Sequence, residues 1–132
     1  MSDKLQKQIL VELEQLRRLL RIHQPLLEKC RKTPPNEIEL SALAAMLHSF
    51  YTGIENIFKR VAVEMDDGPP AGEIWHRRLL DSMAQQGTVR PALLGTALRD
   101  LLRGYLDFRH VFRHAYTHEL QSNSNSRRSC VP

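Results

Sequence analysis

The amino-acid sequence predicts an all-α fold, an antiparallel up-and-down bundle of four to five helices. Three observations lead to this prediction: apolar residues recur every three or four positions along most of the chain, no segment alternates as a strand would, and the connections are short. The 132 residues, of which 42% are hydrophobic, are enough for one domain with its own core. No apolar run approaches the ~20 residues that cross a bilayer, so we expect no membrane contact.

A long apolar stripe predicts the first helix. Pro25 lies inside the stripe and should kink the helix, and the run Thr33-Pro34-Pro35 should end it. The stripe consists of Leu5, Ile9, Leu13, Leu16, Leu20, His23 and Leu27.

A second and denser apolar series predicts a central helix that reaches Met65. Asn36 has the character of its N-cap, and Glu39, three residues on, is the expected partner in a capping box. Gly53 lies inside this helix, where glycine costs about 1 kcal/mol relative to alanine. We interpret Gly53 as a point of close packing between helices.

Two more helices are expected after the loop signal of residues 66–72, Asp-Asp-Gly-Pro-Pro-Ala-Gly. The third should start at about Glu73 and stop at Gly87, and Pro91 should lie in the first turn of the fourth. The third helix should bury one side, namely Trp75, Leu79, Leu80 and Met83. The fourth should bury Leu93, Leu94, Leu98, Leu101, Leu102, Tyr105 and Leu106, and its pattern continues through Phe108, Phe112, Tyr116 and Leu120.

Residues 121–132 have no apolar periodicity, so we expect a disordered polar tail after a single helical domain that spans residues 1–120. The two cysteines, Cys30 and Cys130, are far apart in the sequence and do not indicate a disulfide framework. The expected location is therefore the cytoplasm, a reducing compartment.

Charge is unevenly distributed. Residues 1–75 carry a net charge of −1 and residues 76–132 a net charge of +5, and every basic residue of the second part is arginine. The planar guanidinium binds phosphate bidentately, so this part favours an anionic partner such as nucleic acid. The alternative is a basic surface that serves solubility.

Residues 108–119 gather three histidines, two arginines and a tyrosine. Histidine exchanges a proton near neutral pH and arginine holds a phosphate, so together they could promote attack at a phosphodiester. On a straight helix, Arg109 and His114 point about 140° apart. Either the helix bends near Arg109 or a second copy of the chain supplies one of the two groups, which favours a site shared across a two-fold axis.

Simpler roles for these residues remain open. Each histidine could be a partly buried structural residue, Tyr116 could belong to the core or an interface, and Phe108 and Phe112 are expected to pack. A metal site is the other alternative, because three histidines stand at steps of four: His110, His114 and His118. The spacing is not that of the HExxH zinc motif.

The residues Arg109, His114 and Tyr116 form the pattern Arg-x4-His-x-Tyr. This pattern resembles that of the HepT-like ribonuclease toxins, a branch of the HEPN superfamily. Residues 47–58 resemble the family's second helix, and residues 75–80 resemble the entry to its third. The resemblance covers roughly residues 5–120.

The resemblance implies a HEPN-like helical bundle that pairs as a symmetric dimer, with the motif in a cleft at the two-fold axis. It implies a metal-independent endoribonuclease toxin, without a cofactor, that is neutralised by a minimal nucleotidyltransferase antitoxin. Arg109 would hold the scissile phosphate of the RNA, and His114 would act as general base or acid at the ribose 2′-hydroxyl. His110 would orient or assist. Tyr116 would contact the substrate and be the AMPylation site.

Other interpretations remain. The chain could be a non-catalytic nucleotide- or substrate-binding partner subunit of a nucleotidyltransferase, or a structural helical adaptor. Glu55 is expected to face into the bundle without an assigned role, and Arg113 and His118 are possible RNA contacts outside the motif.

Overall fold

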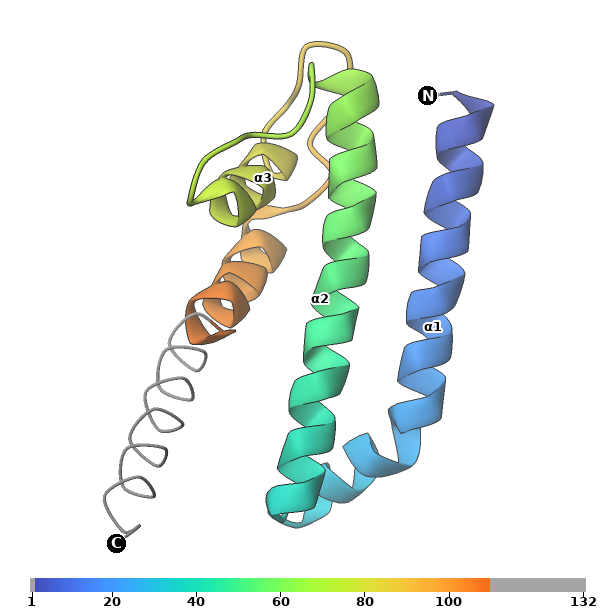
Figure 1. Cartoon of the computed structure of the whole chain (residues 1–132), viewed down its shortest axis with the longest axis vertical. Coiled ribbons are helices and arrows are strands. Elements are labelled where there is room, and N and C mark those ends of the chain that lie inside the picture. Colours follow the sequence, from blue (N-terminus) through green and yellow to red (C-terminus); the bar gives the residue numbers. More distant parts are fainter. Residues whose placement is uncertain (1, 110–132) are drawn as a thin grey trace, which may run out of the picture.

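The computed structural model describes residues 2–109, and within them the chain forms four helices and no strand (Figure 1). Helix α1 spans Asp3–Lys32, α2 spans Glu37–Met65 and α3 spans Trp75–Met83. The fourth helix begins at residue 96 and reaches the last described residue, 109. The all-α prediction is confirmed. None of the helices within residues 2–109 is both long enough and apolar enough to cross a membrane.

Helix α1 begins and ends where the sequence indicates. The Ser2 hydroxyl accepts a hydrogen bond from the Leu5 amide at 3.1 Å, and Thr33 caps the other end just before the two prolines. Pro25 lies inside the helix, where its ring removes one backbone hydrogen bond. Figure 1 shows α1 bending over its final turns, as the sequence predicted.

The predicted capping box starts α2. The Asn36 side chain accepts from the Glu39 amide at 2.8 Å, and the Glu39 carboxylate accepts from the Asn36 amide at 3.1 Å. The Asn36 hydrogen bond lowers the pKa of Glu39, and Lys29, whose Nζ lies 2.9 Å away, lowers it further. Since Lys29 belongs to the last turn of α1, the same carboxylate links the two helices.

Gly53 marks the closest approach of α1 to α2. A Cβ atom at this position would lie 2.6 Å from Cδ2 and 3.2 Å from Cγ of Leu16, a buried residue of α1. Any side chain at Gly53 would therefore push Leu16 aside. The close-packing interpretation of this glycine is confirmed.

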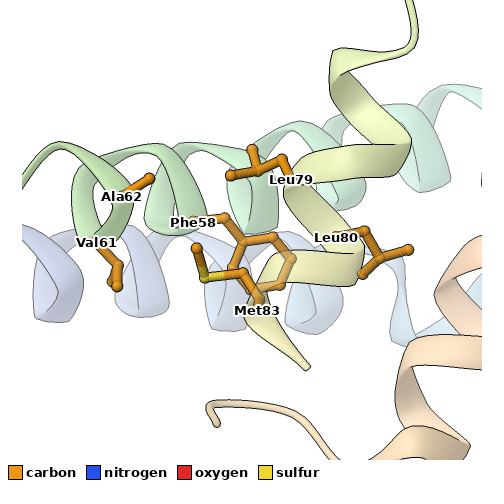
Figure 2. Close-up of a cluster of buried hydrophobic side chains, with 6 residues drawn as sticks. All are labelled: Phe58, Val61, Ala62, Leu79, Leu80 and Met83. Carbon is orange, nitrogen blue, oxygen red and sulfur yellow. The ribbon is translucent and has the colours of Figure 1, made fainter. Parts of the chain in front are cut away.

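The core forms where α3 packs on α2 (Figure 2). Leu79, Leu80 and Met83 of α3 are fully buried, and their partners on α2 are Phe58, Val61 and Ala62. Half-buried residues close the cluster from α1 and from the fourth helix with its preceding connector, among them Ile9, Leu94, Leu102 and Leu106. The predicted buried side of the third helix is confirmed, and α2 is central as expected.

The boundaries between α3 and the fourth helix differ from the prediction. Helix α3 ends at Met83 rather than at Gly87, and the fourth helix starts at residue 96 rather than at Pro91. The Met83 carbonyl accepts from the amides of Leu93 and Leu94 at 2.9 and 3.3 Å. Residues 84–95 therefore form a connector that folds back onto the end of α3.

The exposed side of the fourth helix also differs from the prediction. Leu101 is 72% exposed, because it lies about 100° around the helix from the packed Leu102. Phe108 is 64% exposed, and Leu98 is exposed in the first turn. This surface leaves apolar side chains in contact with solvent in the described part of the chain.

Candidate active site

Arg109 lines a cleft of about 310 Å³ between α3 and the fourth helix. We call this the Arg109 cleft. Its charged and polar lining comes from two sides: Glu73, His76 and Arg77 from α3 and the turn before it, and Asp107 and Arg109 from the fourth helix.

An ion pair joins the two walls of the cleft. Nη2 of Arg77 lies 2.6 Å from Oδ1 of Asp107, and both side chains are about half exposed. This pair balances its own charge. Arg109 differs, because its Nη1 atom is buried and has no hydrogen-bond partner within residues 2–109. Buried polar atoms without a partner are rare and are found at functional sites more often than elsewhere.

His76 is held from behind by a buried carboxylate. Glu55 of α2 is only 5% exposed, and its Oε2 lies 2.5 Å from Nδ1 of His76. An ionised carboxylate can only accept, so Nδ1 carries the hydrogen of this bond. The other ring nitrogen, Nε2, then has its lone pair free for a proton.

An aromatic stack fixes the plane of the same imidazole. The ring centroids of Trp75 and His76 are 3.6 Å apart, with 29° between the planes. Nζ of Lys59 lies 4.4 Å from the Trp75 ring centroid, in a cation–π contact. Since Lys59 follows Glu55 by one turn of α2, one helix holds both the edge of His76 and the ring stacked on it.

Tyr51 lies beneath the site and connects its charges. It is 1% exposed, its ring lies 5.3 Å from that of Tyr105, and its hydroxyl has no partner among the described residues. Burial raises the pKa of Tyr51, the Glu55 carboxylate raises it further, and the Arg109 guanidinium opposes them. The phenol therefore stays protonated at physiological pH, and Glu55 and Arg109 are both close enough to act on it.

Of the site residues predicted from the sequence, the structure describes Arg109. His110, His114 and Tyr116 lie outside the described residues, as do Phe112, Arg113 and His118, so their roles stay predictions. Residues 2–109 contain no group of three or more histidine, cysteine, aspartate or glutamate side chains that could hold a metal ion.

The inward orientation predicted for Glu55 is confirmed, and its partner is new. Sequence reasoning assigned no role to His76, which lies 21 residues further along the chain. One signal was present: a carboxylate on the apolar face of a central helix needs a hydrogen-bonding partner when it is buried.

A comparison with protein-family models places the chain. A model described as HepT-like protein matches residues 42–129, which include Glu55, His76 and Arg109. No curated protein and no solved structure matches the chain. Because the matched segment takes in well over half of the residues, including most of α2, all of α3 and the fourth helix, the chain belongs to the HepT-like protein family.

Proposed function

We propose that this protein is a metal-independent endoribonuclease, the toxin of a toxin–antitoxin module. One observation carries the proposal: the arginine of the Arg-x4-His-x-Tyr pattern, Arg109, lines an open cleft and has a buried Nη1 without a partner within residues 2–109. A guanidinium in this position can bind an anionic oxygen of a phosphodiester. Membership of the HepT-like family and the net charge of +5 over residues 76–132 support the same function.

The reaction uses a nucleophile that the RNA itself supplies. The ribose 2′-hydroxyl loses its proton and its oxygen bonds to phosphorus, while the bond from phosphorus to the 5′-oxygen breaks. The products are a 2′,3′-cyclic phosphate and a 5′-hydroxyl. Arg109 stabilises the negative charge that develops on the phosphate oxygens. His114 acts as general base or acid, His110 assists it, and Tyr116 contacts the RNA.

We expect the purified protein to cleave end-labelled RNA in the presence of EDTA and to leave DNA of the same sequence intact, because DNA lacks the 2′-hydroxyl. Electrophoresis with end-group analysis should show a cyclic phosphate. An RNA with 2′-O-methyl groups at the cleaved positions is the matched control and should resist. Cleavage of DNA, or loss of activity in EDTA, contradicts the mechanism. Binding of RNA or nucleotide without cleavage identifies a non-catalytic partner subunit of a nucleotidyltransferase instead.

The proposal includes two protein partners in the cytoplasm. The first is a second copy of the chain in a symmetric dimer, because Arg109 and His114 diverge by about 140° on a straight helix. The second is a minimal nucleotidyltransferase antitoxin that attaches AMP to Tyr116. An adenylyl group there would place a bulky anion beside the phosphate-binding Arg109.

Co-expression with an active nucleotidyltransferase partner should add the mass of AMP to Tyr116 and abolish RNA cleavage. Intact and peptide mass spectrometry measure the modification. Tyr116→Phe keeps the ring and removes the acceptor hydroxyl, so it should stay unmodified and escape inhibition. An unmodified Tyr116 beside an active partner refutes this part of the proposal.

A further inference from the structure

We propose that His76 is the general base of the RNA-cleaving site and that Glu55 is its positioning residue. This inference rests on the proposed ribonuclease function and deepens it. It assigns to α3 a catalytic group that the Arg-x4-His-x-Tyr pattern does not contain.

The first argument is placement. His76 and Arg109 line the same cleft from two different helices. The divergence between Arg109 and His114 along one helix does not apply to this pair. A guanidinium for the phosphate and an imidazole for the 2′-hydroxyl therefore face one cleft within a single protomer.

The second argument is the preparation of the imidazole. Glu55 takes Nδ1 at 2.5 Å, and Trp75 covers one face of the ring. What is left for the cleft is the Nε2 edge, and the His76 side chain is 36% exposed. A carboxylate behind a histidine fixes the tautomer and stabilises the imidazolium that forms when the base takes a proton.

The third argument is that α3 does not need this pair for its attachment. Leu79, Leu80 and Met83 are fully buried and already fix α3 on α2. A buried ionic pair is a weak device for stability compared with packed apolar side chains. The burial of Glu55 is therefore better explained by what it does to His76.

The step balances as follows. Nε2 of His76 takes the proton of the 2′-hydroxyl, the 2′-oxygen bonds to phosphorus, and the bond to the 5′-oxygen breaks. That oxygen takes a proton from His114, which becomes the general acid. Besides Glu55, the charged groups around His76 are Lys59 behind Trp75 and the four residues of the cleft walls: Glu73, Arg77, Asp107 and Arg109.

The test compares ordinary RNA with RNA that carries sulfur in place of the bridging 5′-oxygen at the cleaved position. A thiolate leaves without a proton, so this substrate does not need the acid. We expect His76→Ala to lower kcat by about 10²–10⁴-fold on both substrates, with KM nearly unchanged. His114→Ala should be slow on ordinary RNA and recover on the sulfur substrate. Recovery of His76→Ala on the sulfur substrate overturns the assignment as base.

Two further variants separate chemistry from structure. His76→Gln keeps a donor for Glu55 without a base and should be as slow as His76→Ala, while circular dichroism shows the wild-type helix content. Free imidazole should restore part of the activity of His76→Ala but none of that of Arg109→Ala. Glu55→Gln should lower kcat rather than raise KM. An inactive His76→Ala that imidazole does not rescue argues against the inference.

His48→Ala is the matched control, because this exposed histidine of α2 does not line the Arg109 cleft, and it should cleave as the wild type does. The two proposals fail differently. A wild-type protein that cleaves no RNA overturns the ribonuclease function, and this inference with it. A wild-type protein that cleaves while His76→Ala cleaves equally well overturns only the role of His76.

Discussion

Arg109→Ala is expected to lower kcat for RNA cleavage by about 10²–10³-fold, the loss typical when one preorganised donor to a developing oxyanion is removed. Arg109 lines the cleft and has a buried Nη1 without a partner among residues 2–109. Its removal therefore breaks no described hydrogen bond or ion pair of that atom, and the helix content and melting temperature should change little. Single-turnover cleavage of labelled RNA and thermal circular dichroism measure the two effects.

Two controls make the Arg109 result specific. Arg103→Ala removes an arginine from the same helix that does not line the cleft, and it should retain nearly full activity. Arg109→Lys keeps the charge but not the planar fork, so its rate should lie between those of the wild type and Arg109→Ala. Wild-type rates in Arg109→Ala would remove the arginine from the reaction and with it the main support for the ribonuclease.

The long helices could be predicted because their ends depend on local chemistry. Asn36 and Glu39 bond to each other across three residues, and Thr33 stands directly before two prolines. These signals need no knowledge of the rest of the fold. The same local reasoning was wrong between α3 and the fourth helix. There Gly87 and Pro91 suggested helix ends, but contacts to the Met83 carbonyl and to Arg90 decided the course of the chain.

The candidate site divides in the same way. Arg109 could be selected from the sequence, because it belongs to a pattern with fixed spacing inside one helix. Glu55 could be placed on the inner side of α2 from its apolar neighbours. Its bond to His76 could not be predicted, because the two residues are 21 positions apart and only the packing of α3 on α2 brings them together.

Arg90→Ala is expected to lower the free energy of unfolding by about 3–5 kcal/mol, the usual loss when one partner of a buried ion pair is removed. The Arg90 side chain is 3% exposed. Its Nε and Nη2 donate to the two oxygens of Asp66 at 2.9 and 2.5 Å, and its guanidinium also donates to the carbonyls of Ser82, Gln85 and Pro91. Chemical denaturation followed by circular dichroism measures the loss.

The size of that loss tests what holds the connector of residues 84–95 in place. Arg21→Ala is the matched control, since Arg21 is 72% exposed and its pair with Glu14 spans 3.5 Å, so it should cost less than about 1 kcal/mol. Asp66→Asn in the Arg90→Ala background should cost less than it does alone, because the two residues share one interaction. If Arg90→Ala costs no more than Arg21→Ala, the connector is held by the amides on the Met83 carbonyl, and the guanidinium only fills the space they enclose.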